Sequence, residues 1–304
     1  MKKDSVVWFD GELKENDKVY VHLLNHSINY GSAVFEGIRA YETARGPAVF
    51  RLAEHVERFF NSAKIYSMEI NFSKSDIERA ILSVVKANGL SSCYVRPLCF
   101  YNDEHVGVNT TGKNVSVFIA AVPLPSYFDG KKSDGIKCKI SSWHRISSDI
   151  LPVQAKASGN YLNSIIASNE ARSQGFDEAI LLSSSGCIAE GSGENVFLVK
   201  NGVLETPDEG SDILLGITRD TVMKIGEYKG IKVIDRKIHR EELYTADEVF
   251  LSGTAAEITP VTAVDGIDIK DGKEGPVTKR IKEEYFDIVK GKDKRFLDWL
   301  SFVK

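Results

Sequence analysis

A polar connector stiffened by proline divides this sequence into two apolar regions, and this division constrains the fold more than any other feature. Pro123 and Pro125 are followed by the charged stretch 129–132. Proline restricts the backbone, and polar segments of this kind usually join domains. A chain of 304 residues is long enough for two domains with separate cores. We therefore predict a small domain over 1–122, an interdomain linker over 123–133 and a large domain over 134–304.

The region before the connector has the pattern of a small α+β domain. The segment 52–68 places apolar residues at helical spacing, and a second helix over 75–88 ends before Gly89. Strand-like runs surround these two helices. The predicted strands are 5–10, 18–22, 93–101 and 114–122.

The region after the connector predicts a larger α/β domain. Apolar and charged residues alternate over 136–140, as in a half-buried strand, and Asn201-Gly202 is a strong hairpin signal before Val203. Helices are expected over 160–173 and from about Thr218. Further strands are predicted at 178–182, 195–200, 248–251 and 258–264.

Composition and charge exclude several classes of protein. The net charge of −4 is small for this length and both signs are interspersed, so we expect no affinity for nucleic acid or a membrane surface. No apolar run reaches the length of a membrane span or a signal-peptide core, which indicates the cytoplasm. The four cysteines form no C-x-x-C pair, so we expect buried, reduced thiols and no zinc site.

Lys156 lies in the segment Gln154-Ala155-Lys156-Ala157-Ser158-Gly159-Asn160-Tyr161, between a strand-like run and a helix. The small residues on both sides leave room for a bulky group beside the lysine. Taken alone, the segment fits a surface lysine before a helix at least as well.

Two glycine-containing segments offer binding chemistry. Glu190 stands among glycines that allow a backbone to approach a ligand closely, and a solvated loop carboxylate is the alternative. Gly216-Ile217-Thr218-Arg219 opens a helix, where free N–H groups and the helix dipole favour a phosphate. Thr218 as an ordinary N-cap explains the same residues equally well.

These segments stand in a characteristic order. From Glu190 the chain reads E-G-S-G-E-N-V-F, then Leu204-Glu205-Thr206, then Leu214-Leu215-Gly216-Ile217-Thr218-Arg219. Further motifs are Y-G-S-A-V-F-E-G-I-R (30–39), Y-V-R-P (94–97) and S-G-T-A-A-E-I-T-P (252–260). Together they resemble the class IV aminotransferases, and in particular their branched-chain branch. The resemblance implies a fold type IV enzyme that binds pyridoxal phosphate at the interface of its two domains.

The resemblance implies transfer of the amino group between L-leucine, L-isoleucine or L-valine and 2-oxoglutarate. This chemistry needs an electron sink for the negative charge at Cα, which pyridoxal phosphate supplies. Lys156 would hold the cofactor covalently and carry the Cα proton, while Glu190 would keep the pyridine nitrogen protonated. Tyr161 would hydrogen-bond the phenolic oxygen of the ring, although a core tyrosine would have the same sequence pattern.

Four residues would hold the phosphate of the cofactor. A planar guanidinium suits phosphate oxygens, and Arg58 is the arginine that the resemblance places there. The alternative for Arg58 is a solvated arginine on the polar side of its helix. The remaining ligands would be the main-chain N–H groups of Ile217 and Thr218 and the hydroxyl of Thr254.

The substrate has two carboxylates when it is glutamate and one when it is leucine. Tyr94 and the main-chain N–H groups of Thr254 and Ala255 would bind the α-carboxylate. Arg96 would meet the side-chain carboxylate of glutamate, and a structural ion pair is its alternative. The walls of the substrate pocket would come from Phe35, Tyr30, Gly37, Val108 and Tyr127.

The loop 102–110 would reach the active site of a second subunit, which implies a homodimer at least and leaves a hexamer open. Two departures bear on this pocket. Leu124 stands where bacterial relatives often carry a bulky aromatic, and Asp103-Glu104-His105 place charge in the loop. Both leave the side-chain preference open.

Two alternatives to this function remain. A D-amino-acid aminotransferase or aminodeoxychorismate lyase would share the fold, but D-specific enzymes bind the carboxylate with an arginine and a histidine two residues apart. Here Arg96 is followed by Pro97-Leu98. A non-catalytic binding protein of the same fold is the second alternative, and the retained lysine, glutamate and phosphate ligands argue against it.

Overall fold

The computed structural model describes residues 5–124 and 135–304. They form two compact units, neither of which is continuous in sequence. Of the described residues, the first unit contains 5–124, 155–159 and 288–304, and the second contains 135–154 and 160–287. The expected fold class, α/β in two domains, is confirmed. The boundaries at 122 and 134 stay a prediction, and most of the linker lies outside the described residues.

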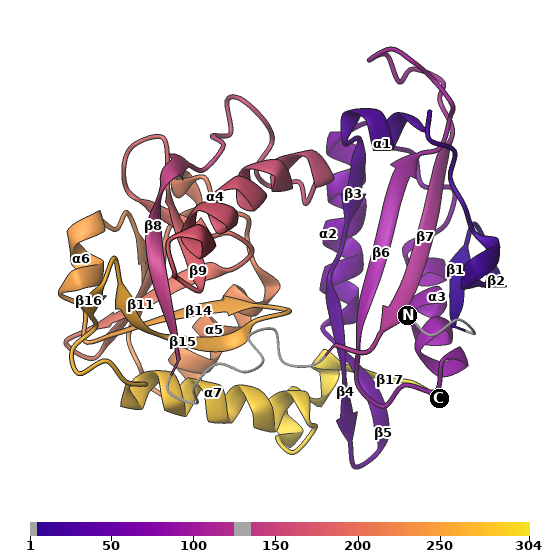
Figure 1. Ribbon diagram of the computed structural model, residues 1–304. Helices are drawn as coiled ribbons and strands as arrows, with labels where there is room; N and C mark the ends of the chain where they lie inside the picture. The colour runs from indigo at the N-terminus through magenta and orange to yellow at the C-terminus, as the bar shows by residue number, and fades with distance from the viewer. Residues whose placement is uncertain (1–4, 125–134) are drawn as a thin grey trace. The chain divides into compact units, whose positions relative to one another are not determined.

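The first unit is built on one antiparallel sheet (Figure 1). Among the described residues it has eight strands in the order β17-β5-β4-β6-β7-β1-β2, and β3 pairs with β6. The strand β17 comes from the end of the chain and pairs with β5. The strands are β1 (Val6–Phe9), β2 (Glu12–Glu15), β3 (Ala33–Phe35), β4 (Ile38–Thr43), β5 (Gly46–Phe50), β6 (Cys93–Tyr101), β7 (Val115–Val122) and β17 (Leu300–Phe302).

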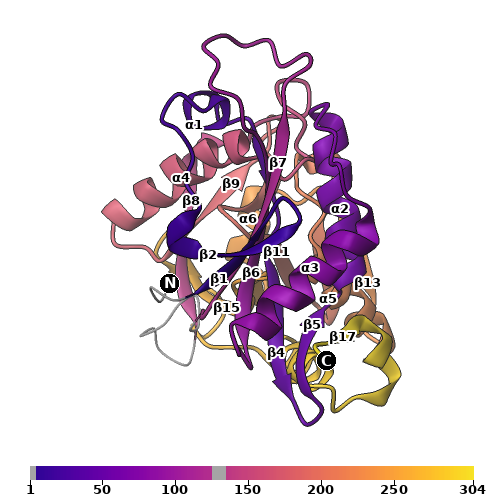
Figure 2. The same ribbon diagram turned by 90° about the vertical axis from the view of Figure 1, so that its right-hand side faces the viewer.

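The helices α2 (Leu52–Ile65) and α3 (Lys74–Ala87) pack on this sheet (Figure 2). Phe59 of α2 and Ile81 of α3 are buried in one core with residues of β4, β6 and β7. Ser73 and Asp76 form a reciprocal capping box that begins α3. Both helices were predicted within three residues of their ends.

The predicted strand at 18–22 is wrong. The chain forms a strand earlier, at β2, and then a short 3-10 turn, η1 (Asn16–Lys18). The β-branched and aromatic residues after Lys18 look strand-like, but these side chains do not face a core: Tyr20 is 80% exposed. The short helix α1 (His26–Tyr30) follows, capped by the side chain of Asn25.

The second unit is built on a mixed sheet that closes on itself. Among the described residues it has nine strands in the order β10-β9-β8-β15-β14-β11-β12-β13, with β16 on β15. An additional pairing of β10 with β11 completes a ring of six strands. The strands are β8 (Ile136–His144), β9 (Glu178–Leu182), β10 (Ile188–Gly191), β11 (Asn195–Lys200), β12 (Val203–Pro207), β13 (Val233–Arg236), β14 (Glu248–Gly253), β15 (Glu257–Val264) and β16 (Ile267–Asp268).

Helix α4 (Tyr161–Ser173) crosses between the parallel strands β8 and β9 (Figure 1). Its Ala167 and Ala171 pack on Ala179 and Leu181 of β9, and these small side chains allow a close approach. The predicted hairpin is confirmed: Asn201 and Gly202 both have the positive φ angles that a tight two-residue turn requires. The other helices are α5 (Ile217–Tyr228), α6 (Arg240–Tyr244) and α7 (Pro276–Val289).

All four cysteines are buried and free, as the sequence predicted. In the part of the chain that the structure describes, no helix has the length and apolarity needed to cross a bilayer.

Candidate active site

Lys156 is held by its main chain in the first unit. Its carbonyl accepts the N–H of Phe35 at 2.9 Å, and its own N–H donates to the buried hydroxyl of Ser62 at 3.0 Å. The Nζ atom lies 4.9 Å from the centre of the Phe35 ring. The side chain is half-buried, whereas a fully solvated surface lysine would be exposed. The two main-chain hydrogen bonds fix the backbone from which the lysine side chain extends.

A buried carboxylate lies directly after Phe35 in the chain. Glu36 is fully buried, and Arg58 donates to it twice, from Nε to Oε1 at 2.6 Å and from Nη2 to Oε2 at 2.9 Å. His55 Nδ1 lies 2.7 Å from Oε2. The alternative of a solvated Arg58 is therefore wrong, because this arginine is paired and its side chain is only 15% exposed.

The charges of this cluster settle its protonation. Burial opposes ionisation of Glu36, but the charge of Arg58, and then that of His55 once acid has protonated it, outweigh burial and hold the pKa of Glu36 well below its usual range. Burial lowers the pKa of His55, with Glu36 opposing the shift and Arg58 and Lys156 adding to it. His55 is thus neutral at neutral pH, and its Nδ1–H donates to the carboxylate, which can only accept.

Three of the expected substrate residues gather around Arg96. Its guanidinium carbon lies 4.7 Å from the centre of the Phe35 ring and 5.2 Å from that of Tyr94, and Nη2 donates to the Tyr94 hydroxyl at 2.9 Å. A Cβ on Gly37 would stand 2.0 Å from the same hydroxyl, so any larger residue there would displace the Tyr94 side chain. Arg96 forms no ion pair with a carboxylate of the described residues; its side-chain hydrogen bond goes to Tyr94.

Tyr30 and Val108 are linked through the loop 102–110. The Tyr30 hydroxyl accepts the N–H of Gly107 at 3.1 Å, and Nε2 of buried His26 lies 3.0 Å from the Gly107 carbonyl oxygen. The loop is therefore anchored at Gly107, while Val108 beside it is 82% exposed. Tyr127, the remaining expected pocket residue, lies outside the described residues.

Glu190 in the second unit is a buried strand residue, so the alternative of a solvated loop carboxylate is wrong. Oε1 accepts from Nε of Arg145 at 2.7 Å. Oε2 accepts the N–H of Leu214 at 2.9 Å and Nδ2 of Asn195 at 3.3 Å. These donors fix the orientation of the carboxylate.

The start of α5 provides a candidate anion site. Gly216 is the N-cap and no side chain caps the helix, so the alternative with Thr218 as N-cap is wrong. Ile217 and Thr218 occupy the first two helical positions and are buried. A Cβ on Gly216 would stand 2.0 Å from Oδ1 of Asn195, which explains the glycine. Asn195 thereby connects this helix start to Glu190.

Thr254 and Ala255 lie in the turn between β14 and β15 and are half-buried. A Cβ on Gly253 would approach the carbonyl oxygen of Gly193 to 3.4 Å, so this turn packs beside the glycine segment that follows Glu190. Tyr161 is the first residue of α4 and is half-buried.

The amino-transferase class IV family matches residues 33–264 of the chain. The chain belongs to the class IV aminotransferases. It is 45% identical to the branched-chain-amino-acid aminotransferase of Escherichia coli strain K12, covering 99% of this chain and 98% of that protein.

Two solved branched-chain aminotransferases share the fold of this class IV chain. The enzyme from Thermoproteus uzoniensis with norvaline has a TM-score of 0.95 at 44% identity, and 99% of each chain is covered. The enzyme from Thermobaculum terrenum, in its PLP-containing holo form, has a TM-score of 0.94 at 35% identity, and 100% of each chain is covered.

Five residues of this class IV aminotransferase were missed by the sequence analysis. Glu36 and Asn195 lie inside motifs that were recognised, so their position was an available signal: Glu36 stands between Phe35 and Gly37, and Asn195 follows Glu190 by five residues. No local pattern marks the other three. The missed residues are Glu36, His55, Ser62, Arg145 and Asn195.

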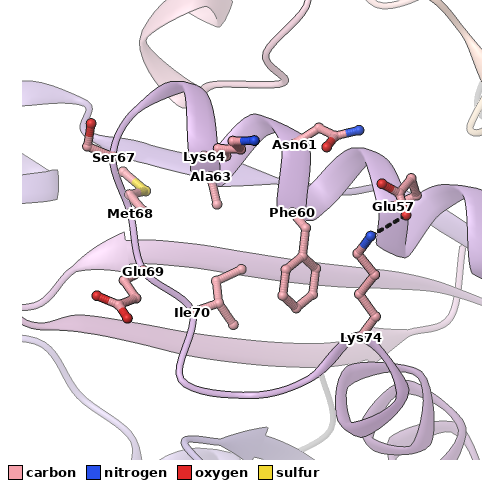
Figure 3. Close-up of a pocket in the computed structure, with 10 residues that line it drawn as sticks. All are labelled: Glu57, Phe60, Asn61, Ala63, Lys64, Ser67, Met68, Glu69, Ile70 and Lys74. Atoms are coloured by element: carbon pink, nitrogen blue, oxygen red, sulfur yellow. Dashed lines mark hydrogen bonds and ion pairs between the residues drawn. The ribbon is translucent and has the colours of Figure 1, made fainter.

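A cavity of about 570 Å³ opens on the first unit between the end of α2 and the start of α3 (Figure 3). Phe60, Met68 and Ile70 line its apolar part, and Lys74 pairs with Glu57 at its edge. None of the expected site residues lines it, so we do not assign it to catalysis.

Proposed function

We propose that this chain is a branched-chain-amino-acid transaminase that uses pyridoxal phosphate and transfers the amino group between L-leucine, L-isoleucine or L-valine and 2-oxoglutarate. The observation that carries the proposal is the setting of Lys156, whose backbone is bonded on both sides and whose amine lies over Phe35. The relatives are branched-chain enzymes over nearly their full length, which disfavours the D-amino-acid and aminodeoxychorismate alternatives.

The residues present fit pyridoxal phosphate. The start of α5 has no capping side chain, as a phosphate-binding helix end requires, and Glu190 is a buried carboxylate suited to a protonated ring nitrogen. The phosphate would be held by Arg58, Ile217, Thr218 and Thr254. When bound, the cofactor supplies an electron-withdrawing ring that stabilises negative charge at the substrate Cα.

Each of the remaining residues has a defined task in this proposal. Lys156 holds the cofactor and moves a proton at the substrate Cα with its amine. Glu190 holds the proton of the ring nitrogen, and the hydroxyl of Tyr161 bonds the phenolic oxygen. Tyr94 and the N–H groups of Thr254 and Ala255 bind the α-carboxylate.

Arg96 would allow one pocket to accept two unlike substrates. Its guanidinium is already stacked on Phe35 and bonded to Tyr94, so an apolar side chain does not meet an unpartnered charge. When glutamate binds, the guanidinium would turn to the side-chain carboxylate, which would otherwise be buried without a partner. Phe35, Tyr30, Gly37, Val108 and Tyr127 would form the walls.

We also propose a homodimer at least, in the cytoplasm. Exposed apolar side chains cluster in sequence around α1 and at the tip of the loop 102–110, which is the pattern of a surface covered by a partner. The most exposed are Tyr20 and Leu23 at 80%, Val108 at 82% and Val106 at 75%. Assembly to a hexamer stays open.

The absorption spectrum of the purified protein reconstituted with pyridoxal phosphate tests the function. We expect the cofactor band to change on addition of L-leucine and to be restored by 2-oxoglutarate. D-leucine is the matched control and is expected to leave the band unchanged. A response to D-leucine and not to L-leucine would overturn the proposal in favour of a D-specific enzyme.

A further inference from the structure

Arg145 forms a buried ion pair with Glu190. It follows β8, is buried, and its N–H donates to the carbonyl of Leu182 in β9 at 2.7 Å. Among the residues that the structure describes, Glu190 is the only carboxylate with which Arg145 forms an ion pair. Nη1 of Arg145 is buried without a hydrogen-bond partner. The positive charge is thus not shared with a second acid.

The partners of Glu190 differ in charge. The N–H of Leu214 and the amide of Asn195 are neutral donors, and both reach Oε2. Arg145 alone of these three is a cation, and it binds the other oxygen. A full charge favours the ionised carboxylate more strongly than a neutral donor does.

We propose that Arg145 is a positioning residue that keeps the shared proton on the pyridine nitrogen of the cofactor and off Glu190. The inference rests on the proposed role of Glu190. A proton between these groups has two places: on nitrogen beside an anionic carboxylate, or on the carboxyl group beside a neutral ring. A cation bound to the carboxylate lowers the proton affinity of that carboxylate, so the proton stays on nitrogen.

Removal of the cation reverses this preference. A carboxylate buried as deeply as Glu190 is disfavoured in its charged form, and the proton would move from the ring nitrogen to the carboxylate oxygen. The ring would become neutral and a weaker electron sink. The substrate-binding residues would be untouched, so the loss would fall on kcat and leave KM for leucine unchanged.

Nitrogen NMR of the holoenzyme, reconstituted with pyridoxal phosphate labelled with nitrogen-15 in the ring, tests the proposal. We expect a pyridinium signal in the parent and a neutral-pyridine signal in Arg145→Gln, with kcat lowered on the order of 100-fold. Arg145→Lys retains the charge and is expected to retain the pyridinium signal. Asn195→Ala, the matched control, removes a neutral donor and is also expected to retain it.

Glu190→Gln separates the two proposals. A pyridinium signal in Arg145→Gln, together with its loss in Glu190→Gln, would overturn the role of Arg145 and leave the proposed function standing. A pyridinium signal in Glu190→Gln would overturn the role of Glu190 itself.

A second variant covers the case in which Arg145→Gln does not fold, as judged by circular dichroism. Arg145→His carries a positive charge only at acidic pH. Its ring signal is expected to change from pyridinium to neutral pyridine as pH rises through the histidine range. A pyridinium signal that does not change with pH in this variant would overturn the proposal.

Discussion

The main-chain N–H of Lys156 donates to the hydroxyl of Ser62, two residues that are 94 positions apart in the sequence. Ser62 lies on α2, the helix that also carries His55 and Arg58. Helix α2 therefore positions both residues: it carries the proposed phosphate arginine, Arg58, and its Ser62 holds the backbone of the proposed cofactor lysine. Because that helix is packed into the core of the first unit, its position is not easily changed.

Lys156→Ala is expected to abolish turnover while the protein stays folded, because the proposed covalent link and the proton transfer depend on one side chain. The measurement is leucine–2-oxoglutarate transamination together with the melting temperature. Lys86→Ala, which removes an exposed lysine from α3, is the matched control. Substantial transamination by Lys156→Ala would refute the assignment.

Glu190→Gln is expected to slow the single-turnover reaction with leucine by orders of magnitude. A neutral amide does not stabilise a protonated ring nitrogen, and one lost charge pair in a buried site costs about 3–4 kcal/mol at the transition state. Glu209→Gln changes an exposed carboxylate of the same unit and should leave the rate unchanged. A rate close to that of the parent would show that Glu190 has another task.

Arg96→Ala is expected to damage the glutamate half-reaction far more than the leucine half-reaction. The guanidinium bonds to Tyr94 and stacks on Phe35, so leucine does not require its charge, whereas glutamate does. Stopped-flow measurement of each half-reaction separately distinguishes the two. Equal losses would mean that Arg96 is structural or binds the α-carboxylate.

The stability of the protein is expected to fall on acidification in two steps. Burial lowers the pKa of His55 below its ordinary 6.5, and Arg58 and His55 hold that of Glu36 below its ordinary 4.5 against the effect of burial. In both cases the unfolded chain takes up the proton first. The contribution of these two groups to the free energy of unfolding is thus fully present above pH 6.5. It declines below pH 6.5 as His55 takes up a proton in the unfolded chain, and it declines further below pH 4.5 as Glu36 does. Urea unfolding as a function of pH measures this.

Glu36→Gln should destabilise the folded state by about 3–5 kcal/mol at neutral pH, because it removes the charged half of an ion pair whose carboxylate is fully buried and whose Arg58 side chain is only 15% exposed. The decline below pH 4.5 should become shallower in this variant. An unchanged free energy of unfolding would show that the buried ion pair is neutral for stability.

Sedimentation of the parent at assay concentration is expected to show a dimer or a larger assembly. Leu23→Asp places a charge on the exposed apolar surface near α1 and should favour the monomer and lower activity. Ile267→Asp, on the exposed strand β16 of the second unit, is the control. An active monomeric parent would contradict the proposed assembly.

Local patterns were sufficient to predict much of the fold. Apolar spacing identified α2, and the helix ahead of Gly89 was identified as α3. Alternation identified β8, and strand-like or apolar runs identified β6, β7 and β11. Helix α7 was missed although its signal was present: it begins at Pro276, and Ile281, Tyr285 and Ile288 are buried at helical spacing. The strand β17 has no comparable signal, because three residues become a strand only when β5 is beside them.

The candidate site shows the same limit. Motifs identified Lys156 and Glu190, but not the ion pairs that orient the carboxylates and guanidinium groups around them. Glu36 and Arg58 are 22 residues apart, and Arg145 and Glu190 are 45 apart. Each pair joins different elements, so only the assembled sheet and its helices bring the partners into contact.

The first unit gains its edge strand β17 from residues 300–302, which a ribosome produces after every residue of the second unit. The first unit therefore begins to be synthesised before the second unit but is completed after it. A nascent chain that ends before residue 155 lacks both the Lys156 segment and β17, and β5 would stay an open sheet edge. We expect this edge to be the part of the growing chain most in need of a chaperone.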